Sequence, residues 1–138
     1  MNLNDLIVPS KTTWVDYPGI PDFEVQLSYL TREELIKIRK KASSNKLNRK
    51  TRQVEEDLDS DLFQELYIKA VIKGWKGLTY KEVAKLLPIN ENAIDDFEAE
   101  LEYSEDNAIA LMKNSPEFDS FISETLDDVS AFTQSNKS

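Results

Sequence analysis

The chain has 138 residues, a length typical of one domain. Hydrophobic residues make up 40% of it and charged residues 31%, a composition typical of globular proteins. It has neither cysteine nor histidine, which excludes disulfides, thiolate nucleophiles, histidine bases and zinc sites built from imidazole or thiolate. No apolar run approaches the roughly 20 residues that span a bilayer, and the first residues lack the pattern of a secretory signal. We therefore expect a cytoplasmic protein that does not enter membranes.

Charge is distributed unevenly along the chain, whose formal net charge is −9. Nine of the seventeen Lys and Arg residues fall between Arg32 and Arg52, whereas thirteen acids and one base lie between Glu91 and Asp128. The negative total argues against general binding to nucleic acid or anionic lipid. The segregation predicts contact with an oppositely charged partner or with another copy of the chain.

The first predicted element is a β-hairpin over residues 12–29. Apolar and polar side chains alternate over Phe23–Tyr29 with the period of two of a half-buried strand, and Thr12–Tyr17 precedes it across a turn rich in Pro and Gly. An isolated hairpin is marginal in water, so its apolar face must lie on helices.

A helix is predicted over residues 31–42, because Thr31 and Glu34 fit a capping box. The following stretch, residues 43–58, is polar and basic and shows no periodicity. It is interpreted as a mobile, solvated loop.

A helical core is predicted over residues 59–132, with a polar tail at 133–138. Asp59 or Ser60 caps its first helix, and glycines end that helix around Trp75. The second helix starts at another capping box, Thr79 to Glu82. A third starts at Asn90 or Asn92 and carries Ile94, Phe97 and Leu101. The last two start at Asp106 and at the Ser115-Pro116 pair before Glu117.

These elements predict one domain over residues 1–138. Its fold class is mostly α (α+β), with the N-terminal hairpin packed on a bundle of about five to six helices.

Acidic motifs in the chain do not fit a chemical site. The run Asp57–Asp61 opens like a calcium loop, but Leu62 replaces the glycine of the sharp turn and Ile68 replaces the bidentate Glu. Neighbouring carboxylates after residue 94 are interpreted as the solvated face of a helix. General acid–base catalysis would need a cleft in which the two carboxyl groups have different pKa values. We predict no metal, no cofactor, no catalytic residue and no enzymatic activity.

The stretch Leu78–Ile94 resembles the helix-turn-helix of sigma-factor-like regulators, with Ala84 at the position that needs a small residue. Leu87-Pro88 stands where that family usually places glycine. The would-be recognition helix has only acidic charges and would repel the DNA backbone. A DNA-binding regulator therefore stays an alternative, as does an acidic inhibitor of a basic host protein.

Two further segments resemble tail assembly chaperones of long-tailed (siphovirus-type) bacteriophages. They are Ile72–Leu78, with its Trp-Gly turn, and Asn107–Phe118, which leads into Phe121 and Ile122. The resemblance implies a small, mostly helical protein of the host cell cytoplasm that is not in the mature virion. Such proteins keep the tape measure protein soluble until tail tube protein polymerises around it, and a frameshifted longer form engages the tube protein.

A chaperone of this kind needs apolar side chains that grip a client and surplus charge that keeps it soluble. The candidates for client binding are apolar residues that would otherwise be ordinary core. They are Trp14, Met112, Phe118, Phe121 and Phe132.

The charge segregation also predicts head-to-tail self-association into rings or open spirals, which high salt would dissolve. The basic region of one copy would meet the acidic helix of the next. The basic candidates are Lys37, Lys40, Lys41, Arg49 and Arg52, and the acidic candidates are Asp95, Asp96, Glu98 and Glu102.

Overall fold

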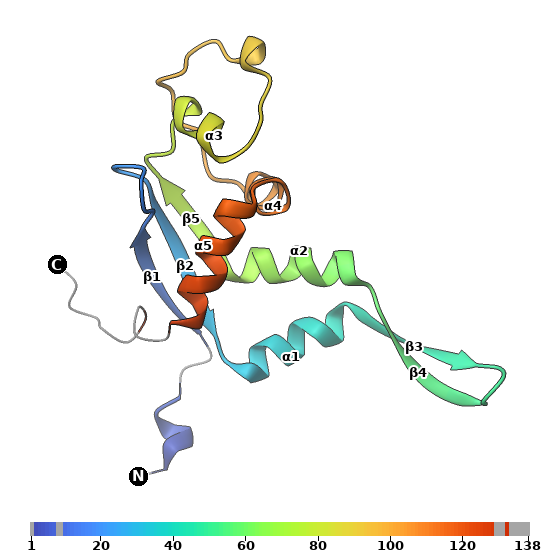
Figure 1. The fold of residues 1–138 in the computed structure, drawn as a ribbon. Helices are drawn as coiled ribbons and strands as arrows, with labels where there is room; N and C mark the ends of the chain where they lie inside the picture. The colour runs from blue at the N-terminus through green and yellow to red at the C-terminus, as the bar shows by residue number, and fades with distance from the viewer. Residues whose placement is uncertain (1, 8–9, 129–131, 133–138) are drawn as a thin grey trace.

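Strands β1 (Ser10–Asp16), β2 (Glu24–Leu30) and β5 (Ile72–Lys76) form an antiparallel sheet in the order β1-β2-β5 (Figure 1). The computed structural model describes residues 2–7, 10–128 and 132. β1 and β2 are the hairpin expected over residues 12–29, and Val15 lies opposite Val25 in its register. Val25 and Leu27 are fully buried, as the alternation of the sequence requires.

β5 is a strand that the sequence pattern does not predict, because its residues continue the apolar face of the preceding helix. α2 (Ser60–Val71) ends one residue before it, and Ile72 already has an extended backbone. Trp75 pairs with Val25, and Gly74 pairs with Gln26. A Cβ on Gly74 would lie 3.2 Å from the Gln26 Oε1 atom, so the small residue permits this close pairing.

The described residues contain five α-helices. They are α1 (Arg32–Lys41), α2, α3 (Tyr80–Leu86), α4 (Glu105–Asn114) and α5 (Pro116–Asp127), with short 3₁₀ helices η1 (Leu3–Asp5) and η2 (Glu91–Ala93). Four of the α-helices begin at the caps that the sequence indicates, whereas α4 is capped by Ser104 and not started by Asp106. The side chains of Thr31, Asp59, Thr79 and Ser115 each accept a hydrogen bond from a backbone N–H in the first turn.

The core lies between the three-stranded sheet and the helices. α2 contacts β2 and β5, α4 contacts both α2 and α5, and α5 crosses the sheet (Figure 1). The side chains at its centre come from all these elements. They include Phe23, Leu27, Ile68, Ile72, Leu78, Leu111, Phe118 and Ile122.

Residues 43–58 form a second antiparallel sheet rather than a loop. β3 (Ser43–Asn48) pairs along its length with β4 (Gln53–Leu58), and the turn between them places Arg52 at φ 59°. We call this hairpin the arm, because it extends away from the ends of α1 and α2 (Figure 1). The Asp59 N–H donates to the Ala42 carbonyl at 2.8 Å and closes its base.

The helix expected from Asn90 to Leu101 is not formed. Residues 88–101, which we call the acidic loop, are irregular apart from the turn η2 and an isolated antiparallel β-bridge between Glu100 and Thr79. The segment runs back to α3. Its carbonyls at Ala99 and Phe97 accept hydrogen bonds of 3.0 Å from the first two N–H groups of α3. In a helix, acids at positions 91, 95, 96, 98, 100 and 102 would lie one turn apart and repel each other.

The predicted fold class is therefore wrong. The described residues form five α-helices and five strands in two antiparallel sheets, which is a mixed α+β fold and not one hairpin on a helical bundle. The polar tail expected at 133–138 lies outside the described residues.

Candidate interaction surfaces

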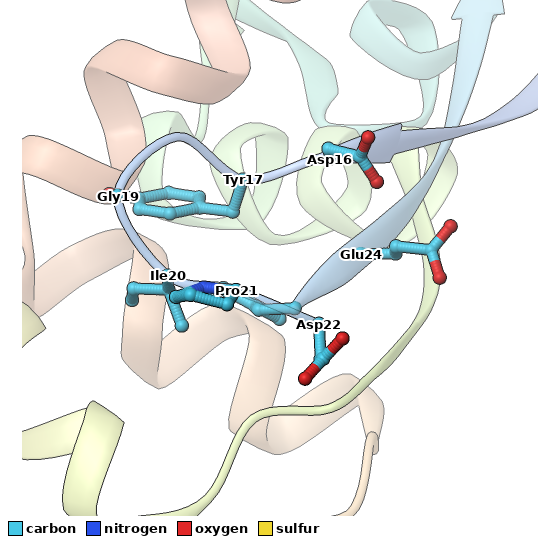
Figure 2. A pocket seen from close by; sticks show the side chains of 8 residues that line it. Asp16, Tyr17, Gly19, Ile20, Pro21, Asp22 and Glu24 are labelled. Atoms are coloured by element: carbon cyan, nitrogen blue, oxygen red, sulfur yellow. The ribbon is translucent and has the colours of Figure 1, made fainter.

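A pocket of about 570 Å³ lies at the turn between β1 and β2 (Figure 2). Tyr17 and Ile20 form its inner wall, and Asp16, Asp22 and Glu24 place carboxylates around its rim. The pocket opens to solvent, and the described part of the chain holds no group of three or more acids that would bind a metal. This arrangement does not bring the carboxylates together around one point.

Tyr17 lies beneath this pocket and is a titratable group whose pKa the fold changes. Burial, with the negative charge of Glu117 as a second cause, raises the pKa of Tyr17 to about 12. Its ring lies 4.7 Å from that of Phe121 and 5.2 Å from that of Phe23. The hydroxyl is buried and makes no hydrogen bond of normal geometry, so this side chain serves packing.

The candidate client-binding residues are divided between core and surface. Met112, Phe118 and Phe132 are buried, so a client would reach them only if the fold opened. Phe121 is half-buried against Tyr17. Trp14 is 43% exposed on edge strand β1, with the Lys76 Nζ atom 4.6 Å from the centre of its ring.

The candidate self-association residues lie in separate parts of the molecule. Lys37, Lys40 and Lys41 are exposed on α1, and Lys37 pairs with Glu34 at 3.2 Å. Arg49 and Arg52 lie at the turn of the arm. The acids Asp95, Asp96 and Glu98 are exposed in the acidic loop, and Glu102 is exposed just after it. The arm and the acidic loop extend from different ends of the body (Figure 1).

Two sets of exposed apolar side chains were missed by sequence reasoning. The first is the N-terminal segment, residues 2–7, where Leu3 is 68%, Leu6 61% and Ile7 51% exposed. The second is in the arm, where Leu47 is 59% and Val54 67% exposed. The available signal was the presence of large apolar residues inside otherwise polar stretches.

The N-terminal segment borders a second pocket, of about 420 Å³, against the start of α1. Asn4 and Ile7 line one side, and the first two turns of α1 line the other with Arg32, Glu33 and Lys37. Ile36, on the same helix, is 41% exposed. Apolar and charged side chains are thus presented together here.

Among the described residues, no helix has both the length and the apolar character needed to cross a bilayer.

Residues 28–138 match the model of a family described as YdaY prophage protein. No curated protein and no solved structure is significantly similar to the chain. The matched region contains the arm, the acidic loop and all five α-helices. The chain therefore belongs to the YdaY prophage protein family and is a phage-derived protein.

Proposed function

We propose that this phage protein is a tail assembly chaperone that binds the tape measure protein and keeps it soluble until the tail tube forms around it. Membership of a prophage family supports a role in phage biology, and residues Ile72–Leu78 and Asn107–Phe118 carry the resemblance to such chaperones. The protein would act in the host cell cytoplasm, without catalysis, and would be left out of the mature virion. A frameshifted longer form would bring in the tail tube protein.

The observation that carries this proposal is the exposed apolar surface of the N-terminal segment. Leu3, Leu6 and Ile7 are each more than half exposed and lie within five residues of one another. The adjoining pocket offers charged groups of both signs from α1. The apolar face of an amphipathic client helix would cover these apolar side chains, and polar groups of the same helix would contact the charged groups of α1.

The test is coexpression with the tape measure protein of the same phage, with the soluble fraction of the client as the readout. The triple variant Leu3→Ser, Leu6→Ser, Ile7→Ser is expected to lower client binding at least about tenfold, because each lost apolar contact costs about 1 kcal/mol or more. Its melting temperature should stay close to that of the wild type, since the three side chains are exposed.

The matched control is the pair Leu62→Ser and Phe97→Ser. These side chains are 39% and 40% exposed but lie on α2 and the acidic loop, so client binding should be unchanged. A wild-type protein that leaves the tape measure protein insoluble would overturn the function. A triple variant as effective as the wild type would overturn only the choice of surface.

The acidic loop supports a second candidate, an inhibitor of a basic host protein. Its acids Glu91, Asp95, Asp96 and Glu98 are exposed and point to an oppositely charged partner. Reversing Asp95 and Asp96 to Lys would abolish such binding and leave the solubility of the tape measure protein unchanged. The DNA-binding alternative lacks support, because the acidic loop replaces the recognition helix.

A further inference from the structure

The arm carries an uncovered apolar pair at its middle. Leu47 and Val54 lie directly opposite each other in the β3–β4 register, so both side chains are on one face. Both are more than half exposed. A two-stranded hairpin is marginal in water unless its apolar face is packed, and this arm extends away from the body (Figure 1).

Charge changes sign along the arm. The turn carries Arg49, Lys50 and Arg52, and all three are exposed. β4 carries Glu56 and Asp57 toward the base, where Glu56 pairs with Arg39 of α1 at 2.8 Å. The tip is therefore positive and the base negative. A second arm laid antiparallel to the first would place opposite charges side by side at both ends.

We infer that the arms of two copies of this chain pair antiparallel about a two-fold axis that passes the Leu47–Val54 pair. The two apolar pairs then cover each other. In the β3–β4 register the Asn45–Glu56 pair lies two residues from the apolar pair and is therefore on the same face. Counting the same distance from the axis toward the turn, Arg49 and Arg52 of one arm come level with Asn45 and Glu56 of the other.

This pairing is isologous, because the same patch is used twice and the contact closes as a dimer. The head-to-tail contact expected from the sequence is heterologous and would not place the two Leu47–Val54 pairs on each other. The inference is independent of the proposed chaperone function, since it uses the arm and not the N-terminal segment. Failure of one does not affect the test of the other.

Crosslinking tests the alignment, because the chain has no cysteine of its own. Val54→Cys places the new thiols of the two copies beside the axis, so a short bis-maleimide should join them into dimers. Asn45→Cys alone should give no dimers, whereas an equal mixture of Asn45→Cys and Arg49→Cys should. Joining through Asn45→Cys alone, or no joining through Val54→Cys, would overturn the antiparallel alignment.

Charge reversal tests the contacts in solution, with sedimentation over a range of protein concentrations as the readout. Arg52→Glu and Glu56→Arg should each weaken self-association about tenfold, because each variant changes two symmetric contacts. The double variant should restore it, and Asp95→Lys in the acidic loop should leave it unchanged. A wild-type mass that stays monomeric at all concentrations, or a double variant no better than the single ones, would refute the pairing.

Discussion

Gly77 joins β5 to α3 at a crowded turn. Its φ of +80° belongs to the left-handed region, and a Cβ there would overlap the carbonyl oxygen of Asp22. Its N–H also donates to the Glu100 carboxylate at 2.6 Å. The residue thus brings together the β1–β2 turn, the end of β5 and the acidic loop.

Gly77→Ala should therefore lower the free energy of unfolding by roughly 3 kcal/mol or more, from backbone strain added to a steric clash. Gly19→Ala is the matched control, because Gly19 has φ +86° but an added methyl group would meet nothing within 4 Å. It should cost only about 1–2 kcal/mol. Urea unfolding measures both, and equal losses would contradict the proposed clash.

The raised pKa of Tyr17 leads us to predict that the protein loses stability at high pH. Its pKa is raised to about 12 in the fold, whereas an unfolded tyrosine titrates near 10, so the unfolded state loses its proton first. The free energy of unfolding should fall as pH rises from about 10 to 12, by up to about 1.4 kcal/mol per pH unit from this group.

Tyr17→Phe should remove that part of the pH dependence and leave stability at pH 7 equal or higher, because the hydroxyl is buried without a hydrogen bond of normal geometry. Burial also raises the pKa values of Tyr67 and Tyr103, so the variant should keep a smaller slope. A slope identical to that of the wild type would show that Tyr17 is not the group involved.

At the scale of secondary-structure elements, Ser115 connects α4 to α5. Its N–H donates to the Leu111 carbonyl at the end of α4, and its Oγ accepts from the Phe118 N–H at the start of α5. The residue is fully buried. Pro116, at the first position of α5, has no N–H that would need a partner.

Ser115→Ala should cost about 1–2 kcal/mol, because it leaves a buried N–H without its acceptor. Ser104→Ala, at the exposed N-cap of α4, should cost less, about 0.5–1 kcal/mol, since water replaces the lost acceptor. Thermal unfolding compares the two. A larger loss for Ser104→Ala would contradict this account.

Local start signals predicted most helix positions, since capping is decided by neighbouring residues. Thr31, Asp59, Thr79 and Ser115 all cap the helices expected of them. Asn90 also accepts from a backbone N–H, but only one 3₁₀ turn follows it, because repulsion among the acids opposes a longer helix.

The missed strands depend on contacts that are distant in sequence or on weak patterns. β5 has the apolar residues of a continuing helix, and its pairing with β2 joins residues about fifty positions apart. The arm has a strand pattern in which Leu47 and Val54 are almost the only apolar residues. Charge patterning located the exposed basic and acidic segments. Helical spacing alone left open whether Met112 and Phe118 pack in the core or bind a client, and the structure buries both.

At the scale of the whole molecule, the arm is the segment that proteases should reach first. Trypsin is expected to cut at Arg49, Lys50 or Arg52 before any site in the body, because these residues lie at an exposed turn. Mass spectrometry of early fragments identifies the position. If arms pair, cleavage should slow as protein concentration rises, and early cuts within α2 or α4 would contradict the expected order.

The single peptide hydrogen bond between Asp59 and Ala42 has an evolutionary consequence. It closes the base of the arm, so insertions in the outer turn should cost the body little folding free energy, because the entropy of loop closure grows only slowly with loop length. The outer turn can therefore vary in length and sequence while the body keeps its fold.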